Sequence, residues 1–408
     1  MANATAFGTN DPRTQRKYST DVFEYALQNI ALTPLMGNTK DSLIHVNQEL
    51  TKQKGDVVIF ESKSPMSGAG QGDDGSTTGN EESLKRRNMS VKVHERSHSY
   101  VSNGAISEQR TATNIREDGK ADLGSWFAEA MENDLITSMA GLYNENASSS
   151  AIETINESYP TTNRIYYGGQ SAAGTLGNSG ASYGTDALLT AGTKTDNLFG
   201  TKLIEMIRRR AQACSPRFRP VAIRDLSNAN PNDTRSYANA PLVGKYFLVL
   251  AHPLQIKAVR EESGTTGWAA MTAAAQVRGN LNPIFSGAAF LWDSCIVWEY
   301  DRIPIRTGAG GTTLAEGFLL NAGRTATTDT CATTRTVARA LMMGAQAMAF
   351  AWAQRLKWWE DMVDCNKPKV KVDAIYGVKR TNFNEHGTET ATSDEAIYCM
   401  DTEVVVDA

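Results

Sequence analysis

A glycine-rich segment between two predicted strands limits the possible folds more than any other feature of the sequence. The run Asp56 to Glu61, DVVIFE, predicts one strand, and Met89 to Val101 predicts a second, because Val91 and Val93 alternate with polar residues. Between these strands, residues 65–87 carry glycines among Asp, Ser and Thr and offer too little apolar surface to pack. We therefore expect a long hairpin that projects into solvent or onto a partner.

Helical patterns lie on both sides of this hairpin. Residues 1–20 are polar, and apolar residues with mixed helical spacing follow at 22–30 before Pro34, which predicts an extended arm with a short anchoring helix. From Asp122, a candidate N-cap, an apolar stripe recurs at three- and four-residue steps and predicts a helix of about six turns. The stripe consists of Leu123, Phe127, Met131, Leu135, Met139 and Leu142.

The second half of the chain mixes helices and strands. Tyr246 to Ala251 predicts a buried strand, and Pro253 suits the first turn of a following helix. From Thr336 to Trp359 the chain is apolar on almost every face, but Arg339 interrupts it, so we expect a helix buried in a large core rather than a membrane span. Residues 370–378 alternate and predict a strand with one buried face. Because no regular βαβ repeat is present, the sequence predicts an α+β architecture.

Composition narrows the classes of function. The 408 residues are 41% hydrophobic, which is enough for one large core or two joined cores. A net charge of -4 lacks the basic excess of a strong duplex-binding protein, so we do not expect the chain to read DNA sequence. The polar amino terminus has no secretion signal, and five widely spaced cysteines form neither a zinc knuckle nor a CxxC pair. We expect a cytoplasmic chain with reduced thiols, no cofactor and no bound metal.

One motif suggests an enzyme. Residues 94–98, HERSH, match HExxH, in which two histidines one helical turn apart bind zinc and the glutamate acts as general base. A zinc metallopeptidase using His94, Glu95 and His98 is therefore one alternative. The flanking residues alternate with period two, however, and on a strand the two histidines lie about 13 Å apart. One zinc ion with ligands at about 2.1 Å cannot bridge that gap, so we favour a structural strand that belongs to the hairpin.

The other motifs are weaker. GQGDDG at 70–75 matches the GxGxxG pattern of pyrophosphate-binding turns. Its two aspartates would repel a diphosphate, and the residues that follow cannot begin an apolar helix, so we expect a flexible hairpin tip. Basic clusters at 85–87 and 208–210 could contact nucleic acid phosphates, but the overall charge favours contacts between subunits.

A series of short segments in fixed order carries more information than any of these motifs. The segments are LMG at 35–37, GDVVIF at 55–60, RIYYGG at 164–169, RRRA at 208–211, FLVLAHP at 247–253, NPIFSG at 282–287, IVWE at 296–299 and LMMGAQA at 341–347. Together they resemble a family of tailed-bacteriophage major capsid proteins with the Hong Kong 97-type fold. The likeness covers most of the chain, and none of the segments is a catalytic signature.

This resemblance implies an α+β, Hong Kong 97-type capsid fold. The implied units are an N-terminal arm at 1–50, a two-stranded extended loop at 51–105, a peripheral domain with a spine helix and a surface insertion at 106–215, an axial domain at 216–360, and C-terminal strands at 361–408 that return to the peripheral domain. The implied function is self-assembly through hexameric and pentameric capsomers into an icosahedral phage head that encloses double-stranded DNA. Assembly would take place in the host bacterial cytoplasm.

The implied partners are other copies of the chain, with portal, scaffold and decoration proteins as further candidates and with packaged DNA held without sequence-specific binding. We expect subunit contacts at the hairpin and at the basic clusters. The carboxylates expected to pair with a neighbour are Asp73, Asp74, Glu81 and Glu82, and the candidate cations are Lys85, Arg86, Arg87, Arg208, Arg209 and Arg210. The same fold would also suit the shell of a bacterial nanocompartment that encloses a cargo protein, which is the second alternative.

Overall fold

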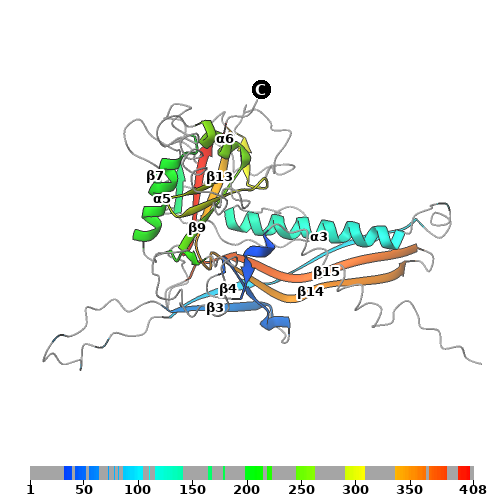
Figure 1. Cartoon of the computed structure of the whole chain (residues 1–408). Coiled ribbons are helices and arrows are strands. Elements are labelled where there is room, and N and C mark those ends of the chain that lie inside the picture. The colour runs from blue at the N-terminus through cyan, green and yellow to red at the C-terminus, as the bar shows by residue number, and fades with distance from the viewer. Residues whose placement is uncertain are drawn as a thin grey trace, which may run out of the picture.

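The computed structural model joins two large β-sheets through one long helix (Figure 1). A third, two-stranded sheet packs across the back of the longer sheet. None of the helices in the described part of the chain is long and apolar enough to cross a membrane. The structure describes residues 32–38, 42–51, 55–63, 72, 78, 81, 86–103, 110, 115–140, 164–167, 178–179, 198–214, 218–222, 245–261, 290–307, 336–363, 367–383 and 394–404.

The longer sheet has five strands in the order β1-β2-β14-β15-β5. The strands are β1 (Met36–Gly37), β2 (Ile44–Asn47), β14 (Met348–Val363), β15 (Lys367–Arg380) and β5 (His94–Val101). The 16 residues of β14 span roughly 50 Å at about 3.3 Å per residue. Helix α3 (Ile115–Ala140) has 26 residues and a length of about 39 Å, so it lies along most of the sheet (Figure 1).

Helix α3 packs through the predicted apolar stripe. The stripe residues from Leu123 to Met139 are buried and share one core with Val370, Val372 and Tyr376 of β15. Leu142 lies outside the described residues. The helix begins at Ile115, so Asp122 is an exposed residue inside the helix and not its N-cap. The predicted start was wrong because the first two turns are mostly polar, and apolar periodicity does not reveal them.

The second sheet has nine strands. Seven follow the order β10-β11-β9-β13-β16-β6-β7, while β12 pairs with β13 and β8 pairs with β9. The strands are β6 (Ile165–Tyr167), β7 (Asn178–Ser179), β8 (Val221–Ala222), β9 (Lys245–Ala251), β10 (Phe290–Trp292), β11 (Cys295–Glu299), β12 (Ile305–Thr307), β13 (Thr336–Met343) and β16 (Ile397–Glu403). Helices α5 (Thr201–Ala213) and α6 (Pro253–Glu261) pack with one face of this sheet, and the other face joins the core beneath α3. The predicted strand at 246–251 and the helix starting at Pro253 are confirmed.

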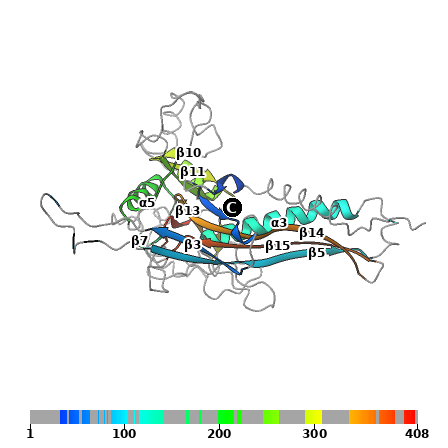
Figure 2. The same ribbon diagram turned by 90° about the horizontal axis from the view of Figure 1, so that it is seen from below.

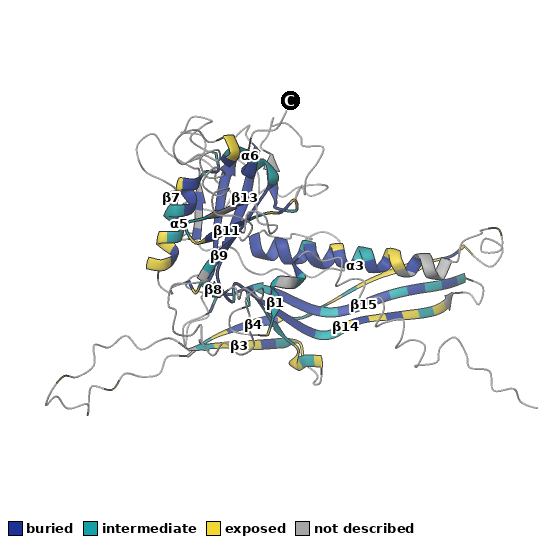
Figure 3. Cartoon of the chain, viewed as in Figure 1, coloured by how far each residue is buried: buried dark blue, intermediate teal, exposed yellow. Residues whose placement is uncertain are grey.

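The segment 336–359 is not the buried helix that the sequence predicted. It forms β13 and most of β14, joined by residues 344–347, where Gln346 adopts a positive φ of 58°. In β13, Met342 packs with α5 and α6 while Leu341 packs beneath α3, so both strand faces are buried (Figure 3). A strand covered on both faces has no alternating polar positions, which is why its pattern resembled that of a buried helix.

The predicted hairpin is confirmed in its stem. Strands β3 (Val57–Lys63) and β4 (Arg86–Lys92) pair antiparallel. Their buried residues pack against Ala349 and Ala351, on the face of the long sheet opposite α3; these residues are Val58, Phe60, Met89 and Val91. The second predicted strand, 89–101, is interrupted at Val93, so β4 stays with the hairpin while β5 joins the long sheet.

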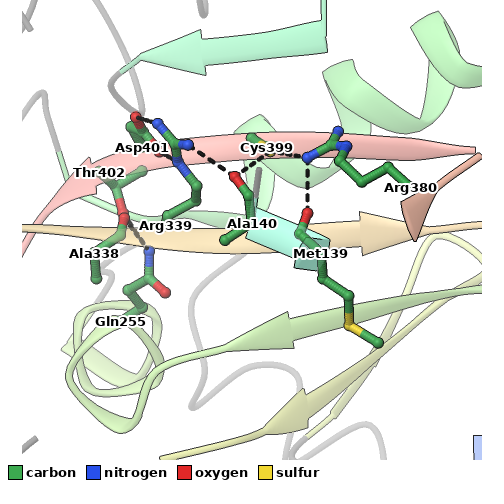
Figure 4. A network of polar contacts seen from close by, with 9 residues as sticks. All are labelled: Met139, Ala140, Gln255, Ala338, Arg339, Arg380, Cys399, Asp401 and Thr402. Atoms are coloured by element: carbon green, nitrogen blue, oxygen red, sulfur yellow. Dashed lines mark hydrogen bonds and ion pairs between the residues drawn. The ribbon is translucent and has the colours of Figure 1, made fainter. Parts of the chain in front are cut away.

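A buried polar network holds the C-terminal end of α3 (Figure 4). Arg339 of β13 makes two hydrogen bonds of 2.7 Å to Asp401 and donates to the carbonyl of Ala140 at 2.9 Å. Arg380 of β15 donates to the carbonyl of Met139 at 2.7 Å and forms an ion pair with Asp394 at 2.8 Å. Burial opposes the positive charge of Arg380, but Asp394 and the sulfur of Cys399 raise its pKa above the ordinary value.

The unit boundaries implied by the resemblance remain a prediction, and the strands near one of them can be placed. The boundary between residues 360 and 361 falls inside β14. Of the strands after it, β15 belongs to the long sheet, whereas β16 belongs to the nine-stranded sheet. The predicted arm helix at 22–30 lies outside the described residues, as does most of the surface insertion at 144–197.

Two glycines provide a matched test of the hairpin anchor. A Cβ at Gly377 would lie 2.0 Å from the backbone oxygen of Lys92, whereas a Cβ at Gly119 in α3 would meet nothing within 4 Å. We predict that Gly377→Ala lowers the free energy of unfolding by about 1–3 kcal/mol through overpacking. Gly119→Ala should raise it by about 0.5–1 kcal/mol. Urea unfolding of the unassembled chain measures both, and equal effects of the two variants would contradict the close crossing.

The buried ion pair between Arg339 and Asp401 makes a second prediction. Arg339→Met removes the buried guanidinium that neutralises the carboxylate of Asp401, so we expect a loss of about 3–5 kcal/mol in the free energy of unfolding. Arg339→Met combined with Asp401→Leu should cost less than Arg339→Met alone, because no uncompensated charge is left. Arg355→Met, at an exposed position, is the control and should change stability by less than about 1 kcal/mol. A double variant less stable than Arg339→Met would refute this account.

Candidate assembly surface

Only some of the hairpin residues predicted to contact a neighbour lie in the described part of the chain. Glu81 is exposed, and Arg86 and Arg87 lie on β4. Arg87 forms an ion pair of 3.1 Å with Glu395, in the segment before β16, so this side chain ties the hairpin to the body of its own chain. Burial raises the pKa of Glu395, although three neighbouring arginines act to lower it. Four predicted residues lie outside the described part of the chain: Asp73, Asp74, Glu82 and Lys85.

The arginines at 208–210 lie in the last turns of α5. Arg208 pairs with Asp293 at 2.8 Å, and Arg210 donates a 3.0 Å hydrogen bond to the hydroxyl of Tyr166 while its guanidinium lies over that ring. Arg209 reaches Glu205 at 3.3 Å, but its side chain is 72% exposed. All three have partners within the chain, and Arg209 is the one most open to a neighbour. Their part in subunit contacts remains a prediction.

The HERSH motif has a structural role in this fold. It lies on β5, which pairs with β15 and not with β3, so its expected place on the hairpin was wrong. The predicted strand conformation is confirmed, and four residues of strand separate His94 from His98 by about 13 Å, too far to share one zinc ion. In the described residues, no group of three or more His, Cys, Asp and Glu side chains is placed to hold a metal ion.

The side chains of the motif alternate between the two faces of the sheet. Arg96 forms a 2.7 Å ion pair with Asp134 of α3, and the ring of His98 stacks on Trp126 of α3 with centroids 4.5 Å apart. Glu95 lies on the other face and pairs with Lys371 of β15 at 3.4 Å. The motif therefore fastens β5 to the long helix and to the neighbouring strand.

Large apolar side chains remain exposed on the long sheet and on the hairpin stem. Ile59 on β3 is 62% exposed, and Tyr100, Val101 and Trp359 at the far end of the long sheet are between 44% and 47% exposed. Sequence reasoning did not single out these residues, because their exposure depends on strand order. Large exposed apolar side chains on strands are suited to contacts with another protein surface.

Comparison with known proteins agrees with this arrangement. The profile of a family described as phage capsid protein matches residues 6–406. The major capsid protein of Pseudomonas phage KPP25 is 22% identical over 395 residues, which cover 94% of this chain and 93% of that protein.

Solved structures show the same fold. The capsid of Ralstonia phage GP4 superposes with a TM-score of 0.64 at 22% identity, with both chains fully covered. The capsid asymmetric unit of cyanophage Pam1 gives a TM-score of 0.62 at 16% identity and covers 93% of this chain and 94% of that chain. The α+β, Hong Kong 97-type fold predicted from the sequence is therefore confirmed. Since the family profile spans nearly the whole sequence, this chain belongs to the phage capsid protein family.

Proposed function

We propose that the chain is the major capsid protein of a tailed bacteriophage. On this proposal, copies of it assemble through hexameric and pentameric capsomers into an icosahedral head that encloses double-stranded DNA. The match to the phage capsid family over residues 6–406 is the observation that carries the proposal. The hairpin stem and the exposed apolar side chains add a physical reason, since such features cost an isolated monomer stability and become useful when neighbours cover them.

The parts of the fold take the following roles in this proposal. The five-stranded sheet with α3 is the peripheral domain, and α3 is its spine helix. The nine-stranded sheet with α5 and α6 is the axial domain around the capsomer axis. The β3–β4 hairpin is the extended loop, and residues before β1 form the N-terminal arm. Strands β13 and β14 connect the two domains directly, because they follow one another in the chain but lie in different sheets.

Function on this reading is spread over the surface and needs no active site. A closed shell requires head-to-tail contacts that form rings and further contacts that join the rings. Surface ion pairs of about 0–1 kcal/mol each suit contacts that must be numerous and correctable. The hairpin carboxylates Asp73, Asp74, Glu81 and Glu82 are proposed to pair with cations of a neighbour, with Arg209 as the most accessible candidate. Portal, scaffold and decoration proteins would be further partners.

Electron microscopy of the purified, recombinantly expressed chain tests the assembly directly. We expect closed shells or capsomer rings, because the family builds shells from repeated copies of one fold. A chain that remains a discrete monomer or dimer at all concentrations and salt conditions would count against the proposal. If shells form, nuclease-protected double-stranded DNA inside particles isolated from infected cells supports the capsid. A co-purifying cargo protein in place of DNA supports the nanocompartment alternative.

Charge reversal at the hairpin tip tests the proposed subunit contacts. We predict that Asp73→Lys with Asp74→Lys abolishes shells or raises the subunit concentration needed to form them at least tenfold, because like charges then face each other. Glu49→Lys with Glu261→Lys, at two exposed positions outside the hairpin and α3, is the matched control and should assemble normally. Light scattering follows assembly, and circular dichroism checks that both variants are folded. Normal assembly of the tip variant would exclude these two carboxylates as contacts.

A further inference from the structure

Strand β5 is the edge strand of the long sheet. It pairs with β15 along its whole length, from His94 to Val101, and no other described strand pairs with its second side. Figure 2 shows β5 at the margin of the sheet, beside β15. An exposed edge of eight residues is a template for another strand, and proteins usually protect such edges with prolines, bulges or inward-pointing charges. The outer part, residues 97–101, SHSYV, carries no Asp, Glu, Lys, Arg or proline.

Exposed aromatic groups gather on the helix side of this edge. Tyr100 is 47% exposed, although it lies on the same strand face as Arg96 and His98, which contact α3. Trp126 of α3 is only partly buried and stacks on His98. The edge thus combines a strand segment without charged side chains and partly exposed aromatic rings. Covering these rings with a second surface is more favourable than leaving them in water.

The charged residues of β5 already have partners in their own chain. Arg96 pairs with Asp134 at 2.7 Å, and Glu95 pairs with Lys371 at 3.4 Å. A second copy of the strand would therefore meet little like-charge repulsion. The low repulsion favours a second copy of β5 as the strand that covers this edge. Every subunit of an assembly carries the same neutral strand, and two antiparallel copies of it are self-complementary.

We propose that β5 pairs antiparallel with β5 of a second copy across a twofold axis and merges two five-stranded sheets into one continuous sheet. A register centred on His98 pairs residues 95–101 of the two copies, which include the whole uncharged part of the strand, and keeps the helix-facing residues of both copies on one face. It places Ser97 opposite Ser99 and Arg96 opposite Tyr100 of the second copy. The Tyr100 and Trp126 rings of both copies would then be covered between two α3 helices. This contact adds to the proposed shell but exists without it, because it needs only two copies.

Paired cysteines test both the contact and its register. In the proposed register, residues 97 and 99 of the two copies lie directly opposite, within the distance that a disulfide requires. We expect Ser97→Cys with Ser99→Cys to give a disulfide-linked dimer on non-reducing gels under mild oxidation. Wild type and each single variant should give at least fivefold less of this dimer, which accounts for the natural cysteines. Equal cross-linking of single and double variants, or none in the double variant, would overturn the register.

An added edge charge tests the contact without cysteines. Ser97→Lys points away from α3 and should shift the soluble full-length chain from dimer to monomer in sedimentation velocity, with at least a tenfold weaker association constant. Ala121→Lys, on the exposed side of α3, adds the same charge elsewhere and should leave the dimer unchanged. Unchanged association of Ser97→Lys would overturn the proposal. Microscopy of wild type separates the two hypotheses: a β5 dimer without shells supports this contact and refutes the proposed function.

Discussion

The C-terminal end of helix α3 is the point on which the two sheets depend. The last carbonyls of a helix have no partner within it and carry the negative end of the helix dipole. Here Met139 and Ala140 receive hydrogen bonds from two buried guanidinium groups, Arg380 at the end of the long sheet and Arg339 in the nine-stranded sheet. Each guanidinium is neutralised by a carboxylate, so the charges can remain inside the protein. One helix end therefore joins both sheets through groups that cannot leave their positions without exposing a buried charge.

Two carboxylates of the same helix accept hydrogen bonds from the two sheets. Asp134 accepts hydrogen bonds from Tyr376 and Arg96 of the long sheet. Glu132 accepts one from Tyr300, at the end of β11, on the side of the nine-stranded sheet. Burial raises the pKa of both tyrosines above their ordinary value, so the hydroxyls remain hydrogen-bond donors over a wider range of alkaline pH. The middle of the helix thus has buried hydrogen bonds to both sheets, in addition to those at its C-terminal end.

Sequence patterns predicted the elements whose burial is one-sided. The stripe of α3 and the alternation at Val370 to Val378 were predicted correctly because polar residues separate the apolar positions that enter the core. The pattern failed for β13 and the first part of β14, where α5 and α6, α3 or the hairpin cover both faces. It also could not place β5, since its pairing with β15 joins residues far apart in the chain. The family was predicted from short segments that follow one another in a fixed order along the chain, and many of them lie in these buried strands.

Ion pairing inside the subunit limits what its surface charges can do between subunits. Arg87 and Arg208 both appeared from sequence to be free for a neighbour, yet each forms an ion pair with a carboxylate of its own chain. A neighbour would have to break that pair before gaining its own, so exchange of partners yields little net energy. The pair of Arg209 with Glu205 is largely exposed to solvent and therefore costs less to exchange, and the second side of β5 is paired with no described strand. On the proposed function, many such weak contacts would act together between subunits, while the buried network at the end of α3 links the two sheets within each subunit.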